Sequence, residues 1–82
     1  MRIDKYLKVS RLIKRRTVAN EACDAGRVLI NGRPVKASAN VKEGDIIEIM
    51  FGNRTLKAEI LDVRENVKKE EAGDMFRLIT EE

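Results

Sequence analysis

The sequence offers no covalent means of holding its fold together. Its 82 residues include one cysteine, Cys23, and no histidine, so neither an intramolecular disulfide nor a zinc site can form. At this size folding hides only about 60% of the surface that the unfolded chain exposes, which leaves room for one thin core. We therefore expect a single domain over residues 1–82, and a binding module in preference to an enzyme.

The hydropathy pattern argues against a membrane or secreted protein. Hydrophobic residues make up 43% and charged residues 38% of the chain, and no apolar run approaches the roughly 18 residues of a membrane span. The first five residues, Met1 to Lys5, carry charges where a signal peptide has its apolar stretch. We expect a cytoplasmic protein.

The charges are distributed unevenly along the chain. Residues 1–36 contain ten basic and three acidic side chains, a net charge of +7, whereas residues 37–82 contain seven basic and eleven acidic ones, a net charge of −4. Such an asymmetry indicates a front half that binds a polyanion and a back half that is solvated or repels it. Nucleic acid is the first candidate.

Two short helices are predicted in the basic half. Ile3, Tyr6 and Leu7 have helical spacing, and an acidic residue in the first turn suits the helix dipole. Residues 10–16 form a connection, after which Thr17 is the expected N-cap of a second helix that ends at Gly26. The buried stripe expected for this second helix consists of Val18, Ala22 and Ala25. Cys23 is expected close to the same face.

The next residues predict an antiparallel sheet. Asn31-Gly32 between the β-prone runs 27–30 and 33–36 is a strong hairpin signal, and Pro34 then belongs on an edge strand. Further strands are expected at 46–51, mostly buried, and at 55–63. Residues 68–72 fit a helical turn and residues 75–79 fit a last strand, although both patterns are less distinct than those of the earlier strands. The predicted fold class is α+β, with two short helices packed on a small antiparallel sheet.

A series of basic side chains follows the first helix and the connection after it. Arginine forks match phosphate oxygens and lysines add point charge, so a face of this kind can follow a sugar-phosphate backbone without reading bases. The alternative is that these residues only solubilise a short helix, but acids are missing after Asp4. The series is Arg2, Lys5, Lys8, Arg11, Lys14, Arg15 and Arg16.

Other chemistry finds little support in the sequence. Tyr6 is more plausible as a core residue than as a base-stacking residue, and three aromatics are too few for a single-strand platform, so structured RNA fits better. Cys23 has no histidine to activate it and is expected to be a packed thiol. The carboxylates are scattered through turns and exposed strand faces, and no two of them form a pair whose surroundings would shift their pKa values for acid-base catalysis. We predict no catalytic residue, no metal and no cofactor.

Several segments follow one another over roughly residues 1 to 50: Arg2-Ile3-Asp4-Lys5-Tyr6-Leu7, Ser10-Arg11, Gly26-Arg27-Val28-Leu29-Ile30-Asn31-Gly32, Val35 and Gly44-Asp45-Ile46-Ile47. In their order and spacing they resemble the S-four type RNA-binding domain. The resemblance implies the alpha-L motif, two helices on a small sheet that bind structured RNA. Residues 51–82 would then supply C-terminal strands and a tail that complete the sheet.

Two further segments narrow the resemblance to a stand-alone group. Residues 9–17 and 68–72 are similar to those of the RqcP (YabO) family, relatives of the ribosome-associated fifteen-kilodalton heat-shock protein, whose long basic C-terminal extension is missing here. The resemblance implies a role in bacterial ribosome-associated quality control. The partners implied are large-subunit rRNA, peptidyl-tRNA and RqcH, the factor that recruits alanyl-tRNA for C-terminal alanine tailing.

Carried over by motif, the basic residues become RNA-binding candidates, with Arg2 and Arg16 the first choices. Asp4 is expected to orient a neighbouring arginine, since a carboxylate facing phosphate is repelled. Arg27 and Arg33 either extend the RNA-binding surface or serve solubility at a strand edge. The RNA-binding candidates are Arg2, Lys5, Lys8, Ser10, Arg11, Lys14, Arg15, Arg16 and Arg27. The alternative function is a protein-interaction or ribosome-assembly module whose basic face docks an acidic partner.

Overall fold

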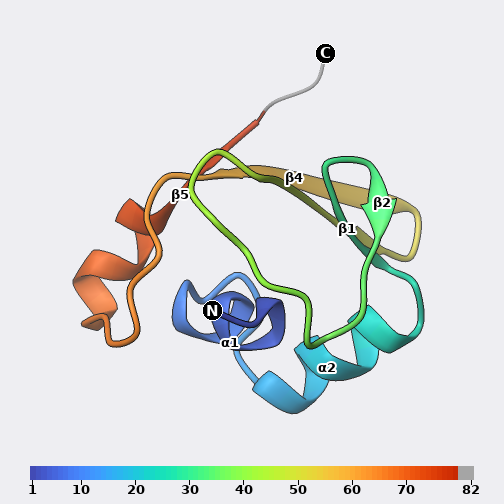
Figure 1. The fold of residues 1–82 in the computed structure, drawn as a ribbon, viewed down its shortest axis with the longest axis horizontal. Coiled ribbons are helices and arrows are strands. Elements are labelled where there is room, and N and C mark those ends of the chain that lie inside the picture. The colour runs from blue at the N-terminus through green and yellow to red at the C-terminus, as the bar shows by residue number, and fades with distance from the viewer. Residues whose placement is uncertain (80–82) are drawn as a thin grey trace.

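Two helices cover one face of a five-stranded antiparallel sheet in the computed structural model, which describes residues 1–79 (Figure 1). The sheet has the strand order β2-β1-β3-β4-β5. This arrangement confirms the predicted α+β fold class. The elements are α1 (Ile3–Val9), α2 (Arg16–Asp24), β1 (Val28–Ile30), β2 (Arg33–Pro34), β3 (Ile46–Phe51), β4 (Arg54–Ile60), the 3₁₀ helix η1 (Lys69–Met75) and β5 (Phe76–Leu78). The expected back segment 51–82 includes residues 80–82, which lie outside the described residues.

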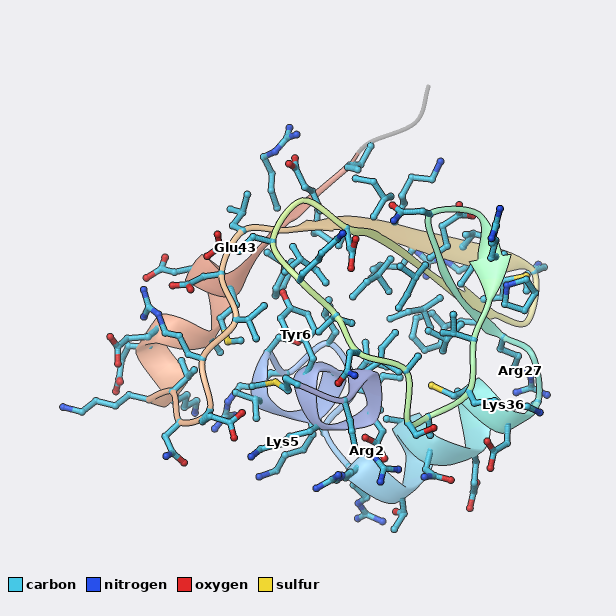
Figure 2. All side chains as sticks on the ribbon, viewed as in Figure 1. Arg2, Lys5, Tyr6, Arg27, Lys36 and Glu43 are labelled. Atoms are coloured by element: carbon cyan, nitrogen blue, oxygen red, sulfur yellow. The ribbon has the colours of Figure 1, made fainter. Side chains whose placement is uncertain are left out.

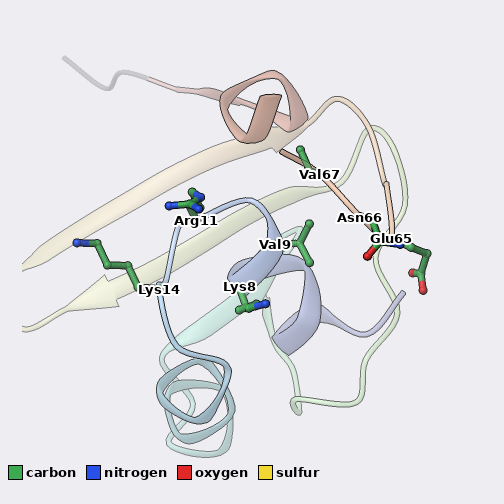
Figure 3. Close-up of a pocket in the computed structure, with 7 residues that line it drawn as sticks. All are labelled: Lys8, Val9, Arg11, Lys14, Glu65, Asn66 and Val67. Carbon is green, nitrogen blue, oxygen red and sulfur yellow. The ribbon is translucent and has the colours of Figure 1, made fainter. Parts of the chain in front are cut away.

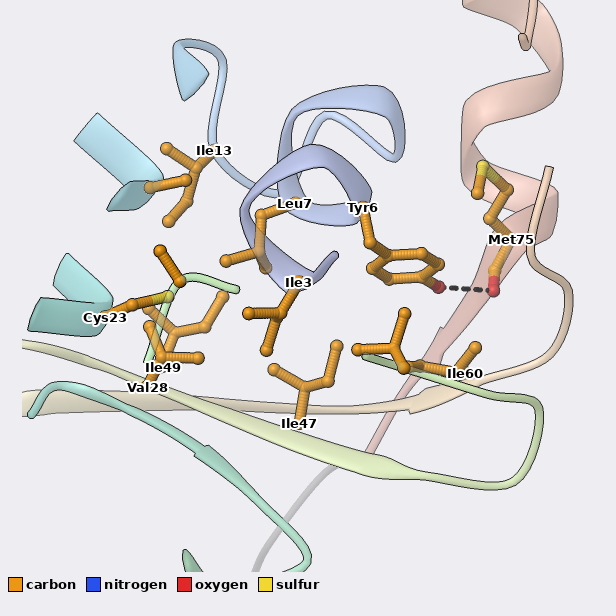
Figure 4. Close-up of a cluster of buried hydrophobic side chains, with 13 residues drawn as sticks. Ile3, Tyr6, Leu7, Ile13, Cys23, Val28, Ile47, Ile49, Ile60 and Met75 are labelled. Atoms are coloured by element: carbon orange, nitrogen blue, oxygen red, sulfur yellow. Dashed lines mark hydrogen bonds between the residues drawn. The ribbon is translucent and has the colours of Figure 1, made fainter. Parts of the chain in front are cut away.

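The core lies between α1 and the middle of the sheet (Figure 4). Ile47 and Ile49 alternate along β3 toward the helices and meet Ile3 and Leu7 of α1, and all four side chains are fully buried. Each contributes about 1.5–3 kcal/mol by leaving water. Only alternate residues of β3 are buried, and Phe51 beside the next turn is exposed, so the expectation of a mostly buried strand over 46–51 was wrong for its outer face and its end.

The start and the buried face of α2 differ from the prediction. The helix begins at Arg16 without a side-chain cap, so Thr17 is not its N-cap. Ala19 and Cys23 are buried, whereas Val18 is 47% exposed. Spacings of four residues fit either face of this helix, and the small side chains of Ala19 and Cys23 allow the closer approach to α1. The predicted stripe through Val18 and Ala25 was therefore rotated by about one residue.

The predicted end of α2 is confirmed. Gly26 has a φ of +76°, a conformation that favours glycine. The N–H of Gly26 donates to the carbonyl of Cys23, and the N–H of Arg27 donates to the carbonyl of Ala22. This is a Schellman motif, which satisfies the last carbonyls and turns the chain directly into β1.

The hairpin between β1 and β2 forms where the Asn-Gly pair predicted it. Asn31 and Gly32 have φ values of +52° and +85°, and Pro34 lies on the edge strand β2, as expected. The Asn31 side chain also accepts a hydrogen bond from the Ile46 N–H (2.9 Å) and donates one to buried Asp45 (3.1 Å). The hairpin is thereby tied to the start of β3.

The C-terminal segment folds back over α1. Strand β4 ends at Ile60, three residues before the predicted end, because the N–H groups of Leu61 and Asp62 turn away to donate to the Met75 carbonyl. The predicted helical turn is the 3₁₀ helix η1, and β5 pairs with β4 as the last strand. Among residues 1–79, no helix is long and apolar enough to cross a membrane.

Candidate nucleic-acid interface

A buried carboxylate organises the side chains at the N-terminal ends of both helices. Asp4 is 2% exposed and accepts hydrogen bonds from Arg2 Nε and Nη2 (both 3.2 Å), from Arg16 Nη2 (3.4 Å) and from Asn20 Nδ2 (3.2 Å). The backbone N–H of Lys5 donates to the same carboxylate at 2.8 Å. We call Arg2, Asp4, Arg16 and Asn20 the Asp4 cluster.

The packing of α1 against α2 brings the Asp4 cluster together. Arg2 immediately precedes α1, and its backbone bridges to Asn40, while Arg16 is the first residue of α2 and Asn20 lies one turn later on the same helix. The side chains of Arg2 and Arg16 remain 49% and 46% exposed beside an open depression of about 500 Å³. Each guanidinium group is thus hydrogen-bonded to Asp4 on one side and exposed to solvent on the other.

The electrostatics of the Asp4 cluster favour an ionised Asp4. Burial raises the pKa of Asp4, but the hydrogen bonds from Asn20 and Arg16, together with the charge of Arg16, outweigh burial and lower the pKa. Asp4 balances one of the two arginine charges, so the cluster keeps a net positive charge. Each guanidinium has five N–H donors, and those not used by Asp4 are available to an incoming anion.

A second group of cations lies at the other end of α1. Lys8, Arg11 and Lys14 line a cleft of about 280 Å³ together with residues 65–67 of the segment that follows β4 (Figure 3). Between the two groups, the Lys5 ammonium pairs with the Glu65 carboxylate at 2.9 Å. The basic face is therefore made of two clusters with a neutralised lysine between them.

The remaining predicted residues are placed differently. Ser10 is buried and its hydroxyl donates to the Leu7 carbonyl at 3.3 Å, so it supports the end of α1 and does not present its hydroxyl to solvent. Arg15 is exposed just before α2. Arg27 follows the C-terminal end of α2, away from Arg2, and is not brought together with the cations at α1 (Figure 2).

Three residues near the basic face were not predicted. Asn20 follows Arg16 by four residues, which is one helical turn, and that spacing was a signal for a shared face. Glu65 and Asn66 come from a segment some 60 residues away from α1, and no local pattern in the sequence pairs them with it.

Tyr6 and Cys23, the candidates for base stacking and for nucleophilic chemistry, are both buried. Tyr6 is fully buried, and its hydroxyl donates to the Met75 carbonyl, so the expectation of a core residue is confirmed (Figure 4). Cys23 is a packed thiol, as expected, and burial with the charges of Asp4 and Asp24 raises its pKa to about 11. Residues 1–79 contain no group of three acidic, cysteine or histidine side chains placed to hold a metal ion.

The family model for the S4 domain matches residues 1–47, more than half of the chain. The chain is therefore an S4-domain protein, in agreement with the predicted S-four type resemblance. Curated relatives make the assignment narrower. The chain is 51% identical to the RQC P-site tRNA stabilizing factor of Streptococcus pneumoniae over 99% of this chain and 92% of that protein. It is 54% identical to the factor of the same name from Listeria monocytogenes, over 100% of this chain and 89% of that protein.

The chain belongs to the family of RQC P-site tRNA stabilizing factors, the RqcP family predicted from the sequence. The relatives that match along nearly the whole chain are named as stabilizing factors, in agreement with the prediction of a binding protein and not an enzyme. The fold is also similar to the trimeric structure of Vibrio cholerae Heat Shock Protein 15. The TM-score is 0.87 and the identity 28%, over 96% of this chain and 81% of that one.

Proposed function

We propose that this protein binds the obstructed large ribosomal subunit through rRNA and the peptidyl-tRNA in its P site. In that position it supports the alanine tailing of stalled nascent chains that RqcH carries out in the cytoplasm. The proposal is supported by the relatives' role as P-site tRNA stabilizing factors. The observation in this chain that carries it is the Asp4 cluster, in which a buried carboxylate aims two half-exposed arginines at solvent.

The mechanism is geometric, and no bond is made or broken by the protein. The free donors of Arg2 and Arg16 bind non-bridging phosphate oxygens, where a planar fork gives both charge and direction. Asp4 acts as a positioning residue, because it holds the two guanidinium groups in one orientation before RNA arrives. A preformed contact loses less side-chain entropy on binding, so a small surface can hold a tRNA in place.

The acidic back half orients the protein on RNA. Glu48 on β3 lies on the sheet face opposite the core and Glu70 lies on η1, whereas Glu59 is paired with Arg77 and Glu71 with Arg64. The net charge of −4 over residues 37–82 repels phosphates and the helical face attracts them, so an encounter with RNA is steered into one orientation. The predicted contacts that reach solvent all take part in this proposal: Arg2, Lys5, Lys8, Arg11, Lys14, Arg15, Arg16 and Arg27.

We further propose that residues 1–50 form the RNA-binding motif and that the rest of the chain acts as its scaffold. Strand β4 pairs with β3 along the whole length of β3, and the Met75 carbonyl at the end of η1 accepts a hydrogen bond from Tyr6 of α1. The two segments share one hydrophobic core, in which Ile60 and Met75 pack with residues of α1. On this basis the chain folds as one unit.

Sedimentation of cell lysate tests the proposal. Tagged full-length protein, Arg16→Ala and the matched control Arg54→Ala are run on sucrose gradients at low and raised salt. Arg54 is exposed and is the first residue of β4. We expect the wild type and Arg54→Ala to peak with free large subunits that carry tRNA, and Arg16→Ala to be released. If all three proteins stay at the top at both salts, ribosome binding is wrong and an acidic protein partner becomes the leading reading.

A further inference from the structure

The cleft at the C-terminal end of α1 has the features of a separate anion site. Lys8, Val9, Arg11 and Lys14 form one side of the cleft and Glu65, Asn66 and Val67 form the other, with a volume of about 280 Å³ (Figure 3). The three cations come from the last turn of α1 and the connection to α2, whereas residues 65–67 follow β4. Segments distant in the sequence thus close around one small space.

The three cations of the cleft have no ion-pair partner among residues 1–79. In the part of the chain that the structure describes, Lys8, Arg11 and Lys14 make no ion pair and no side-chain hydrogen bond. By contrast, Arg2 and Arg16 share Asp4, and Lys5 is paired with Glu65. Three unpaired cations therefore line the cleft against one carboxylate, that of Glu65, which is already paired with Lys5, so an anion placed there is attracted.

Arg11 occupies a backbone position that suits glycine better. It follows Ser10, the C-cap of α1, and its φ is +65°, in the left-handed region that costs free energy for any residue with a Cβ. Its N–H donates to the Lys8 carbonyl, which fixes that conformation. The left-handed turn carries the Arg11 guanidinium to the same side as the Lys14 ammonium (Figure 3).

We propose that this cleft binds a phosphodiester group of RNA, with the attached ribose against Val9 and Val67 and with Asn66 as an additional hydrogen-bonding group. The inference rests on the proposed RNA-binding function and assigns a second phosphate subsite to it. Helix α1 has seven residues and a rise of about 1.5 Å per residue, so the cleft and the Asp4 cluster lie roughly 10 Å apart. The two subsites hold phosphates of different nucleotides.

Equilibrium binding of fluorescein-labelled bulk transfer RNA to the full-length protein at several salt concentrations tests the subsite. Arg11→Gly removes the guanidinium and relieves the left-handed residue, and Arg54→Gln removes an arginine charge elsewhere on the surface. We expect Arg11→Gly to bind about tenfold more weakly than wild type and to lower the slope of log K against log salt by about one. Its melting temperature is expected to be no lower than that of wild type.

A second variant leaves the backbone of α1 untouched. Asn66→Asp places a negative charge in the cleft, and we expect it to weaken binding by a similar factor while the exposed site keeps the fold stable. If Arg11→Gly and Asn66→Asp both bind like Arg54→Gln while Arg16→Gln binds weakly, the cleft is not a phosphate subsite and the proposed function stands. If the wild type binds no transfer RNA at any salt concentration, the subsite is wrong, and sedimentation with large subunits decides the proposed function independently.

Discussion

The Tyr6 hydroxyl donates a 2.7 Å hydrogen bond to the backbone carbonyl of Met75, which joins α1 to the end of η1. The same carbonyl accepts the N–H groups of Leu61 (2.8 Å) and Asp62 (3.2 Å), so one oxygen gathers three segments. Burial and the nearby charge of Asp62 raise the pKa of Tyr6, which therefore remains a donor throughout the working pH range. This junction fixes the segment that brings Glu65 and Asn66 to the basic face.

We predict that Tyr6→Phe lowers the free energy of unfolding by about 0.5–1.5 kcal/mol. The loss stays at this modest level because the Met75 carbonyl keeps its two backbone donors, so no buried polar group is left unsatisfied. Urea unfolding monitored by circular dichroism measures the change. Transfer RNA affinity of the folded variant serves as the control and is expected to be unchanged. A loss above about 3 kcal/mol would mean that the junction depends on the tyrosine alone.

The Asp4 cluster makes a prediction whose sign is opposite to that of simple electrostatics. Asp4→Asn raises the net charge by one and by charge alone should strengthen RNA binding. We expect binding about fivefold weaker instead, because Arg2 and Arg16 lose the carboxylate that orients them. Anisotropy titration with transfer RNA at a temperature where the variant is folded decides between the two. Equal or tighter binding by Asp4→Asn would remove the positioning role.

The same carboxylate predicts how stability depends on pH. The pKa of Asp4 in the folded protein lies below the ordinary value of 3.8, so its contribution is complete above that value and is lost as the pH falls through the folded pKa. Between about pH 4 and pH 2 the wild type should lose more unfolding free energy than Asp4→Asn. The other carboxylates contribute equally to the pH dependence of both proteins, so their contributions cancel in this comparison. Parallel pH profiles for the two proteins would show that Asp4 is not stabilised in its ionised form.

The Lys5–Glu65 pair predicts a variant with stronger RNA binding. Both side chains are partly exposed and the pair adds little stability, but Glu65 neutralises a lysine on the basic face. Glu65→Gln is expected to bind transfer RNA about twofold to threefold more tightly at 50 mM salt, with the gain lost near 300 mM salt. The control is Glu70→Gln on η1, which makes the same charge change away from Lys5. An equal gain in both variants would mean that only net charge matters.

Local patterns predicted local structure well. The Asn31-Gly32 turn, the edge position of Pro34 and the glycine end of α2 all depend on residues within a few positions of one another. The buried face of α2 could not be chosen from periodicity, because Val18 and Ala19 each begin a stripe with helical spacing. Only the packing against α1 and β1 selects between them.

The candidate site was predictable in composition but not in organisation. The density of basic residues indicated the series that contains Arg2 and Arg16, and the family resemblance made these two the first choices and gave Asp4 the role of orienting an arginine. That one carboxylate serves both arginines and Asn20 depends on how the two helices cross. The pairing of Lys5 with Glu65 joins residues 60 positions apart, and the sequence contains no local signal for such a contact.

The central claim is that this protein binds the large subunit together with P-site tRNA. The most direct measurement is equilibrium binding of the labelled full-length chain to purified large subunits that carry P-site peptidyl-tRNA and, in parallel, to vacant large subunits. We predict clearly tighter binding to the tRNA-carrying subunits, and loss of this preference in Arg16→Ala. Equal binding to both kinds of subunit, or binding to neither, would contradict the account.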